Sequence, residues 1–446
     1  MTFDRIAEFV LSGPPVPESA LDMAATLLID TVGVAAGAAG LDVARIARDH
    51  AVAYQSAGSP EQAASLMFDG RQASIPGAAF AAATQIDNLD AHDGLNATKG
   101  HIGCAVVPAL FAFAEKRPDL SGRDALAALV MSYEVAARAA IALHATVSDY
   151  HTSGAWNGLG VAALGCHLKG ADADELRQAL GIAEYHGPRS QMMREIANPT
   201  MLHDGSGMGA MVGCMATFLA MDGFTGAPAV TVEEAAEHWS DLGEIWTIEQ
   251  NYIKPYPICR WAHAALDAVS SLMVSHGFKA DDIASVEVNT FAESAALFPG
   301  MPETTSQAQY SLAFAVAVML TQGRIGPYEI TDAGLRDPAV AALLPCISVC
   351  EEPRHSARFP QGRWSDVTIT LADGSQLASG DVNARGGPEA PMGLHEVEDK
   401  FQTMAASLPR ARRAALWDMR ARLLQPDAKF EELAELVRPP IGTPDA

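Results

Sequence analysis

The chain has 446 residues, and its 30 Lys and Arg against 54 Asp and Glu give a formal net charge of −24. Apolar residues make up 49% of it and charged residues 19%, with no glycine period, heptad run or polar low-complexity tract, which excludes collagen-like, coiled-coil and disordered chains. The length predicts one or two domains with a substantial core. Because so acidic a surface repels phosphate groups, we expect neither nucleic acid nor a membrane as a partner.

The N-terminal residues and the cysteines bear on where the protein works. The opening MTFDRIAEFVLSG places Asp4, Arg5 and Glu8 where a signal peptide needs an uninterrupted apolar core. The longest apolar run, 312–320, is too short to cross a bilayer. The six cysteines are scattered without CxxC spacing, which predicts reduced thiols rather than a disulfide framework, a metal site or an iron–sulfur cluster. We therefore expect a cytoplasmic protein.

The segment up to about residue 267 has a helical pattern. It is rich in Ala, Leu, Met and Gly, with apolar positions three and four residues apart, as in 18–34, 122–144 and 173–185. Two glycine-rich stretches, 154–165 and 205–213, repeat small residues on one helix face. Neither fits GxGxxG behind a strand, so we expect close helix packing there and no nucleotide loop.

Strand patterns begin after residue 268. Residues 285–291 alternate with period two, and 366–371, followed by Asp373-Gly374 and then 376–379, are typical of a strand, a tight turn and a second strand. A buried helix is predicted between them, at 305–322.

Helical patterning returns from about residue 396, so both ends of the chain are predicted to be helical. The fold class that follows is mainly α with a second α+β domain. We expect a large all-helical domain over 1–267, an inserted α+β lid domain over 268–395, and C-terminal helices over 396–446 that return to the first domain.

The first cluster of polar residues that indicates chemistry lies at 87–104. Three carboxylates, two histidines and a lysine, including Asp90, Lys99 and His101, occupy a glycine-broken loop between two apolar helices. Ionisable groups in such a loop can face a cleft at a helix N-terminus, where anions bind well. An ordinary solvated loop with Asp93 as a helix N-cap is the alternative. A calcium loop would need a closing bidentate glutamate, which is missing.

Two further segments carry histidine. His151 stands directly before a helix that starts at a Ser/Thr cap, where a helix N-terminus lowers the pKa of an imidazole and favours its neutral, basic form. A capping-loop histidine without chemistry is equally compatible with that spacing. The Met-rich polar segment 186–205 holds Arg194 and His203, and its alternative interpretation is a surface connection.

The fourth segment, 252–263, lies near the predicted domain boundary. Its prolines make it rigid, so Lys254, Tyr256 and Arg260 would be held near an interdomain crevice, the usual place for a ligand pocket. A proline-stiffened linker would not need these long cationic and phenolic groups. Cations concentrated in the loops of so acidic a chain indicate a site for a small di- or tricarboxylate.

The order of these motifs along almost the whole chain resembles the MmgE/PrpD family. The motifs are an LD-x-x-D loop ending in His-x-Gly (89–103), a histidine before a glycine-rich helix start (151–160), T-x-L-x-x-G (200–205), K-P-Y-P-x-C-R-x-x-H (254–263), S-Q-A-Q-Y-S (306–311) and G-G-P-x-x-P-M (386–392). The fourth and last are specific in combination, although each alone would be weak.

The resemblance implies an enzyme. The family comprises 2-methylcitrate dehydratase, cis-aconitate decarboxylase and iminodisuccinate epimerase, which share an all-helical domain and an α+β lid, need no metal or organic cofactor, and transfer a proton at a carbon next to a carboxylate. By family motif, Asp90, His101, His151 and Lys254 fall on catalytic or substrate-binding positions. The resemblance also favours a homodimer, as does an apolar helical face.

Departures from the family pattern argue against simple transfer of dehydratase or decarboxylase activity, and the length and pattern of the chain are most similar to those of iminodisuccinate epimerase. A substrate-contacting lysine of the dehydratases and the decarboxylase is replaced here by Met201, a histidine or cysteine position is Cys259, and a tyrosine of the decarboxylase is replaced by Phe314. We therefore expect proton removal and return at the α-carbon of an iminodisuccinate-type dicarboxylate. The alternatives are a hydro-lyase or decarboxylase acting on a citrate-like tricarboxylate, and a non-catalytic carboxylate-binding protein.

A two-base mechanism is the hypothesis for the epimerase. One group removes the α-proton and another returns a proton to the opposite face, while cations stabilise the enolate-like intermediate. The candidate bases are Lys254 and either His151 or Tyr256, with His101 in reserve, and Asp90 completes the predicted catalytic set. The predicted substrate-binding residues are Lys99, Arg194, Met201, His203, Cys259, Arg260 and Phe314.

Overall fold

The computed structural model describes residues 2–13 and 15–442 and divides into two compact units. The first unit consists of Met1–Met192, His203–Asn251 and Leu394–Ala446, and the second of Met193–Leu202 and Tyr252–Gly393. The sequence predicts domain boundaries at 267 and 395. The second unit starts at Tyr252 instead, and it also includes the segment Met193–Leu202, which lies inside the predicted helical domain 1–267.

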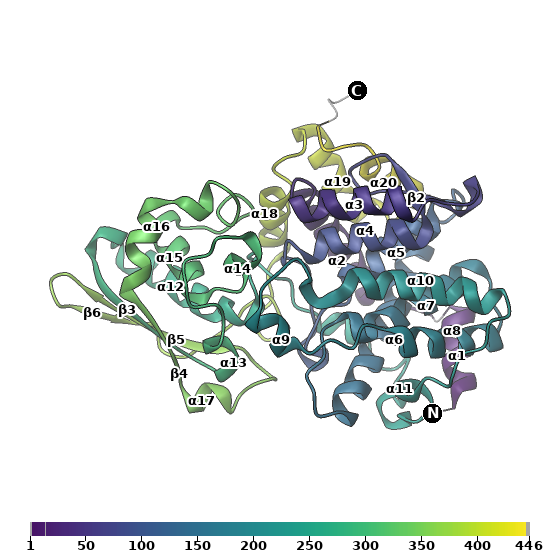
Figure 1. Cartoon of the computed structure of the whole chain (residues 1–446), viewed down its shortest axis with the longest axis horizontal. Coiled ribbons are helices and arrows are strands. Elements are labelled where there is room, and N and C mark those ends of the chain that lie inside the picture. Colours follow the sequence, from purple (N-terminus) through teal and green to yellow (C-terminus); the bar gives the residue numbers. More distant parts are fainter. Residues whose placement is uncertain (1, 14, 443–446) are drawn as a thin grey trace. The chain divides into compact units, whose positions relative to one another are not determined.

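The first unit is almost entirely helical. Helices from the C-terminal end of the chain pack beside those from its N-terminal end (Figure 1). Its elements are α1 (Phe3–Ser12), α2 (Glu18–Ala38), α3 (Asp42–Tyr54), β1 (Ala63–Ser65), β2 (Gln72–Ser74), α4 (Ile75–Asp87), α5 (Gly103–Ala114), α6 (Gly122–Thr146), α7 (Gly154–Lys169), α8 (Ala173–His186), α10 (Ser206–Met221), α11 (Val230–Glu233), α18 (Leu394–Met404), α19 (Arg410–Arg422) and α20 (Phe430–Val437), with α9 (Met192–Ala197) leading out of it.

Glycines let the central helices α7 and α10 of this unit pack closely. A Cβ added to Gly158 would lie 2.8 Å from the carbonyl oxygen of Gly209, and one added to Gly213 would lie 2.5 Å from the carbonyl oxygen of Gly158. Side chains at these positions would force the two helices apart. The two glycine-rich stretches therefore face each other, which confirms the prediction of close helix packing.

Helices α2 and α6 are long and apolar enough to cross a membrane by length and composition alone. The longest uninterrupted apolar run in the sequence is still 312–320, because scattered polar residues interrupt the apolar runs of both longer helices. In the structure, 83% of the apolar window of α2 and 89% of that of α6 are buried inside the molecule. Such burial is typical of helices in the core of a globular protein.

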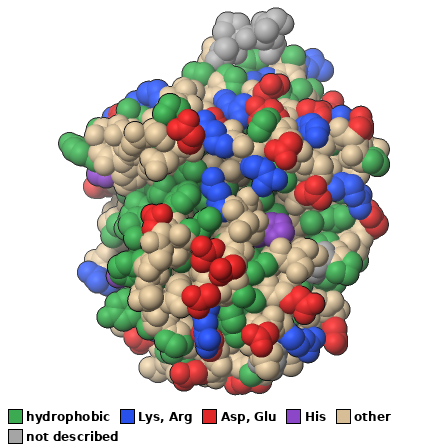
Figure 2. Space-filling model, turned by 90° about the vertical axis from the view of Figure 1, so that its right-hand side faces the viewer, with side chains coloured by type: hydrophobic (Ala, Val, Ile, Leu, Met, Phe, Trp, Pro, Cys, Tyr) green, Lys and Arg blue, Asp and Glu red, His purple; other side chains and the backbone are tan. Residues whose placement is uncertain are grey.

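Helix α10 also has an exposed apolar face. Its 16 residues include no charged side chain, and Met208 and Met215, seven residues apart and therefore on one face, are 42% and 44% exposed. On α3, which packs beside α4, Ile46 and Tyr54 are exposed as well. In the space-filling view, acidic and basic side chains are interspersed over much of the surface, and hydrophobic side chains gather toward the left (Figure 2).

The second unit combines a small mixed sheet with helices. The sheet has the order β4-β3-β5-β6, with β7 also paired to β5. Strand β3 is parallel to β4 and antiparallel to β5. The elements are α12 (His263–His276), β3 (Ile283–Thr290), α13 (Ala292–Ala295), α14 (Thr305–Gln309), α15 (Leu312–Gln322), α16 (Pro338–Leu343), β4 (Ile347–Glu351), α17 (Pro353–Ser356), β5 (Trp364–Leu371), β6 (Gln376–Ala378) and β7 (Val382–Asn383).

The predicted fold class, mainly α with a second α+β domain, is confirmed. The predicted strands correspond to β3, β5 and β6, and Gly374 adopts a positive φ of 85° in the turn between β5 and β6. The single helix predicted at 305–322 is wrong. It is broken into α14 and α15, because the side chain of Ser311 caps α15 by accepting a hydrogen bond from the backbone N–H of Phe314.

Candidate active site

The loop from residue 88 to 102, between α4 and α5, carries four buried ionisable side chains, those of Asp90, His92, Asp93 and His101. It is closed by a hydrogen bond from the Leu95 N–H to the Gly100 carbonyl, at 3.0 Å. Asp90 and Lys99 have positive φ angles of 52° and 54°, which L-residues rarely adopt. Such strain is typical of functional loops. Because Asp90 and His101 are buried, the alternative of an ordinary solvated loop is disfavoured.

His101 is held in one orientation by two hydrogen bonds. Its backbone N–H donates to the Ser153 hydroxyl at 2.9 Å, and its Nδ1 lies 2.7 Å from the carbonyl oxygen of Asp93. Because a carbonyl only accepts, Nδ1 must carry the proton. The neutral ring therefore presents Nε2 with a lone pair, and Nε2 is the atom able to accept a proton from a substrate.

Asp204 faces this Nε2 atom and was not among the predicted site residues. Its Oδ2 lies 3.7 Å from His101 Nε2, and its Oδ1 accepts hydrogen bonds from the Ser153 N–H at 3.2 Å and the Ser153 hydroxyl at 2.8 Å. A carboxylate at this distance stabilises the imidazolium that forms when His101 takes up a proton. The signal available in the sequence was the position of Asp204 next to the predicted His203.

Buried neighbours of His101 form two groups with the spacing of metal ligands. The potential ligand atoms of Asp90, His92 and His101 lie within 4.8 Å of one another, as do those of Asp87, His92 and Cys104. Burial raises the pKa of the Cys104 thiol well above its usual value, so Cys104 is protonated and is a poor ligand. The first group can therefore hold an ion more readily than the second, and the absence of a metal stays a prediction.

A third group with metal-ligand spacing belongs to the second unit and consists of His355, Asp366 and Asp381. Guanidinium groups already occupy its carboxylates: Arg354 pairs with both Asp366 and Asp381, and Arg358 lies 2.8 Å from Asp381. These cations compete with any metal for the same oxygens. The group is therefore an ion-pair network that joins α17 to β5 and to the segment before β7.

Asp93 is buried behind the His101 loop. Its Oδ1 accepts a hydrogen bond from the hydroxyl of Tyr133 on α6 at 3.1 Å. Burial raises the pKa of the Asp93 carboxyl to about 7, and the nearby charge of Asp30 contributes to the rise. Gly103 leaves room for this carboxyl, because an added Cβ would lie 2.1 Å from Asp93 Oδ1. The N-cap role considered for Asp93 is not observed, because Ile102 occupies the N-cap position of α5.

His151 lies in the segment before α7 and is fixed by neighbouring backbone. The Thr152 N–H donates to the Ser190 carbonyl, and the His151 N–H donates to Nε2 of His144 at 3.3 Å. Burial, and then the charge of Lys99, lower the pKa of His144 to about 4, so His144 is neutral. His151 is therefore a buried histidine beside a neutral one.

Lys99 is joined to the same region. Its ammonium lies 5.4 Å from the ring centroid of Tyr150, and the Tyr150 hydroxyl donates to the Lys99 carbonyl at 2.5 Å. Lys99 as a whole residue is half-buried. The first unit thus brings together the predicted residues Asp90, Lys99, His101 and His151.

The other residues predicted in the 186–205 segment are distributed between the two units. His203 begins the short 3₁₀ turn His203–Gly205 in the first unit and is buried. Arg194, on α9, and Met201 belong to the second unit, and both are exposed.

Two of the family-like motifs meet in the second unit. The Ile253 N–H donates to the carbonyl of Gly386 at 3.0 Å, so the segment that carries Lys254 is paired with the late glycine–proline motif. Gly386 has a φ of 104°, and an added Cβ would lie 2.1 Å from the Ile253 carbonyl oxygen, so only glycine fits there. Lys254 is fully buried.

Arg260 and Tyr256 are engaged with neighbours inside this unit. The guanidinium of Arg260 donates to the carbonyls of Arg385 at 2.5 Å and Ala384 at 2.9 Å, and burial lowers its pKa to about 10. The Tyr256 hydroxyl donates to Asp267 at 3.0 Å. Burial, and then the negative charge of Asp267, raise the pKa of this phenol well above its usual value. Tyr256 is thus held protonated, which weighs against its use as a base.

Cys259 and Phe314 occupy structural positions in the same unit. The Cys259 N–H donates to the Gln309 carbonyl at 2.9 Å, and Phe314 is fully buried on α15. Together with Lys254, Tyr256 and Arg260 they form the second group of predicted residues. The roles of both groups stay predictions.

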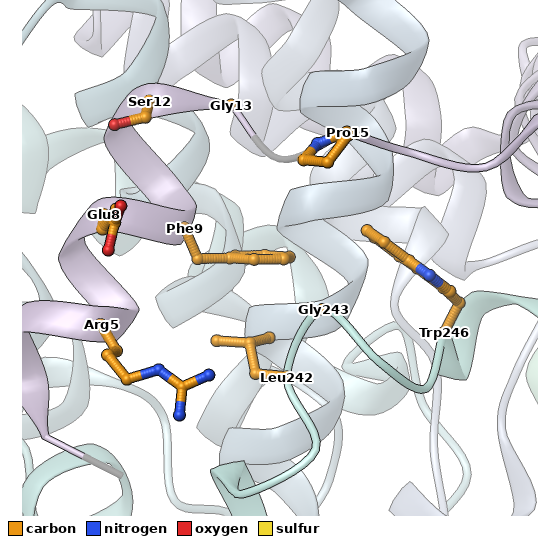
Figure 3. Close-up of a pocket in the computed structure, with 9 residues that line it drawn as sticks. All are labelled: Arg5, Glu8, Phe9, Ser12, Gly13, Pro15, Leu242, Gly243 and Trp246. Carbon is orange, nitrogen blue, oxygen red and sulfur yellow. The ribbon is translucent and has the colours of Figure 1, made fainter.

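The first unit also has a surface pocket of about 270 Å³ between α1 and the segment 242–246 (Figure 3). Phe9 and Trp246 lie across it with ring centroids 6.0 Å apart, and the exposed Arg5 and Glu8 stand at its edge. None of the predicted site residues lines it.

Comparisons with known proteins agree with this architecture. The model of the MmgE/PrpD N-terminal domain matches residues 4–241, and that of the MmgE/PrpD C-terminal domain matches residues 256–424. A cis-aconitate decarboxylase-like protein, oryM, from Aspergillus oryzae (strain ATCC 42149 / RIB 40) is 22% identical over 95% of this chain and 94% of its own length. Since the two domain models cover most of the chain, it belongs to the MmgE/PrpD family.

Proposed function

We propose that this chain is an epimerase that needs no cofactor and that removes and returns a proton at the α-carbon of an iminodisuccinate-type dicarboxylate. Family membership supports an enzyme whose chemistry is related to that of the dehydratases and decarboxylases. The substitutions that favour the epimerase are Met201, which carries no charge, and Phe314, which has no hydroxyl to donate. An epimerase needs only proton transfer, whereas a dehydratase must also expel a hydroxyl group.

The observation that carries the proposal is the orientation of His101. Its Nδ1–H is committed to the Asp93 carbonyl, so Nε2 is the basic atom, and the Asp204 carboxylate lies 3.7 Å from it. Neutral His101 can thus take the α-proton, and Asp204 stabilises the imidazolium produced. Lys254 is the proposed second base, because Tyr256 is held protonated. His151 and Asp90 remain further candidates in the first unit.

Cationic side chains would stabilise the negative charge that forms beside the carboxylate. Lys99 and Arg194 are the predicted residues whose charged groups are at least partly exposed. Arg260 already donates to the carbonyls of residues 384 and 385. We therefore propose that it positions these residues rather than contacts the substrate.

The test is exchange of the substrate α-proton with solvent, followed by NMR in deuterium oxide with iminodisuccinate. We expect exchange with the native protein, a loss of 10²- to 10⁴-fold for His101→Gln, as is usual for removing a general base, and no exchange for Lys254→Ala. His167→Gln is the matched control, because Nδ1 of His167 also binds a carbonyl, that of Val10, at 2.7 Å. Native exchange rates in the His101→Gln protein would contradict the proposal.

The second candidate function is a hydro-lyase or decarboxylase, which the similarity to the decarboxylase-like protein favours. Incubation with 2-methylcitrate or cis-aconitate, followed by ultraviolet absorbance and by release of carbon dioxide, separates these reactions. Turnover of either compound without exchange of iminodisuccinate would replace the epimerase proposal. Binding of dicarboxylates without any exchange or turnover would instead support a carboxylate-binding protein.

We also propose that the protein is a cytoplasmic homodimer whose interface includes the apolar face of α10. Two copies with a net charge of −24 repel each other unless they meet through uncharged surface, and α10 contains no charged residue. Its exposed methionines suit a contact between two identical helices.

A further inference from the structure

A buried ion pair joins two helices from opposite ends of the chain in the first unit. Lys400 Nζ on α18 lies 2.6 Å from Asp30 Oδ2 on α2. Lys400 is only 5% exposed and Asp30 only 1%. Taking two charges out of water is costly, and their attraction offsets that cost only with good geometry and further hydrogen bonds.

The further hydrogen bond leads to the candidate active site. Lys400 Nζ also donates to the carbonyl oxygen of Ala91 at 2.6 Å. Ala91 directly follows Asp90, whose φ of 52° lies in the left-handed region. The ammonium therefore binds the peptide group next to a strained residue, in the same loop as His101.

Close packing of the helices brings Lys400 within reach of this loop. A Cβ added to Gly33 of α2 would lie 2.5 Å from Cδ2 of Phe401. One added to Gly37 would lie 2.6 Å from the carbonyl oxygen of Met404 and 3.0 Å from Leu89 Cδ2. The two glycines thus let α18 and the beginning of the loop approach α2 together.

Stability alone does not explain the pair. The buried stripe of α18 consists of Val397, Lys400, Phe401 and Met404, so a lysine stands where an apolar residue would fit. Replacing a buried ion pair by hydrophobic residues of similar volume is often neutral or stabilising. What an apolar pair could not do is hold the Ala91 carbonyl.

We propose that Asp30 and Lys400 are positioning residues of the active site. Asp30 orients the Lys400 ammonium, and the ammonium fixes the Ala91 peptide and with it the side chain of Asp90 and the loop that carries His101. The ion pair thus maintains the strained loop conformation through the backbone of the loop, at the Ala91 carbonyl. The activity part of this inference rests on the proposed function, whereas its structural part does not.

The decisive variant is the double substitution Asp30→Leu/Lys400→Met, which removes both charges and leaves an apolar pair, with a methionine about as large as the lysine and a leucine larger than the aspartate. Hydrogen–deuterium exchange with mass spectrometry measures how strongly the backbone amides of residues 88–102 are protected from exchange, and it needs no substrate. We expect exchange in this loop to rise about tenfold or more, because the Ala91 carbonyl loses its donor, while the melting temperature changes by only a few degrees. Unchanged protection of the loop would overturn the inference.

Two further variants distinguish positioning from general damage. Arg420→Met is the matched control: it removes an ion pair between α19 and α2, in which Arg420 Nη2 lies 2.7 Å from Asp22 Oδ1. We expect native loop protection in that variant. Asp30→Asn/Lys400→Gln keeps uncharged donors at the same place, so it should retain more loop protection than the Leu/Met pair. If the Leu/Met variant does not fold, the Asn/Gln variant carries the test, because a neutral amide binds the Ala91 carbonyl more weakly than an ammonium does: faster exchange in the loop supports the inference, and native protection overturns it.

The effect of these variants on activity is measured as kcat and KM for α-proton exchange. A misplacement of the reacting groups by about 1 Å can cost 10²-fold in rate, so we expect kcat to fall about 10- to 100-fold in the Leu/Met variant with KM little changed. A rise in KM with native kcat would contradict a positioning role. If the native protein shows no exchange, the proposed function fails, and the loop-protection result still decides the structural inference.

Discussion

The Asp93 carboxyl provides the sharpest test of the electrostatics behind the candidate site. It is fully buried, and its Oδ1 accepts a hydrogen bond from the hydroxyl of Tyr133. Burial raises its pKa from 3.8 to about 7. The substitution Asp93→Asn keeps the acceptor for Tyr133 and removes the titration, so the two proteins should differ in how their stability depends on pH.

The sign and size follow from linkage. The unfolded chain releases this proton near pH 3.8 and the native state near pH 7, so the native state binds more protons in between and its stability falls as pH rises. Between pH 5 and pH 8, these two pKa values correspond to a loss of about 2.6 kcal/mol in the free energy of unfolding. The loss is complete above the native pKa.

Scanning calorimetry of both proteins at pH 5, 6, 7 and 8 measures the effect. At about 2 °C per kcal/mol for a unit of this size, the melting temperature of the native protein minus that of Asp93→Asn should fall by about 5 °C from pH 5 to pH 8. Asp222→Asn, at an exposed position after α10, controls for the loss of one negative charge. A difference that stays constant over this range would refute the reasoning.

Three further predictions concern packing, assembly and thiols. Gly103→Ala should destabilise the protein by about 1–3 kcal/mol, because its Cβ would meet a carboxyl oxygen at 2.1 Å, whereas Gly40→Ala, with nothing within 4 Å, should be neutral; thermal melts compare them. Met208→Glu/Met215→Glu should convert a dimer into a chain of 46.9 kDa in light scattering, and an unchanged mass would exclude this interface. A thiol reagent at pH 8 should modify the exposed Cys350 quickly. Over the same time the buried thiols of Cys104, Cys166 and Cys214 should stay unmodified, since burial restricts access and, for Cys166, raises the pKa to about 12.

Periodicity in the sequence predicts a helix or strand where burial of one of its faces imposes a regular apolar pattern. The strands β3 and β5 alternate because one face of each is buried, and that alternation is visible without the structure. Strand β4, at 347–351, was missed, because it pairs only with β3, and none of its residues is fully buried. The break between α14 and α15 was missed as well, since a cap by Ser311 leaves the apolar pattern intact on both sides.

Composition predicted the loop of the candidate site but not the contacts that organise it. Asp90, Lys99 and His101 stand out as polar residues between apolar helices. Asp204 lies 103 positions after His101, and the two residues are linked through Ser153, whose hydroxyl accepts from the His101 N–H and donates to the Asp204 carboxylate. Lys400 did leave a signal, a lysine on the buried stripe of an amphipathic helix, although its partners become visible only in three dimensions.

Backbone strain connects these contacts. Within residues 2–13 and 15–442, five non-glycine residues have positive φ, and Asp90, Lys99 and Asp204 are three of them, all in the segments around His101. Each is held by a side chain from outside its own segment. The Tyr150 hydroxyl binds the Lys99 carbonyl, Ser153 binds the Asp204 carboxylate, and Lys400 binds the peptide after Asp90.

Unfavourable backbone conformations persist only where surrounding contacts over-determine them, at about 1–3 kcal/mol each. Three tethers on three strained residues therefore imply that the site is fixed before substrate arrives, and that its rigidity originates in the side chains of Tyr150, Ser153 and Lys400. For the proposed reaction, the transfer of one proton at a weakly acidic carbon, such prior organisation lowers the barrier because the donors and the base need not reorganise while charge develops. Loss of a tether should therefore lower kcat before it lowers substrate affinity.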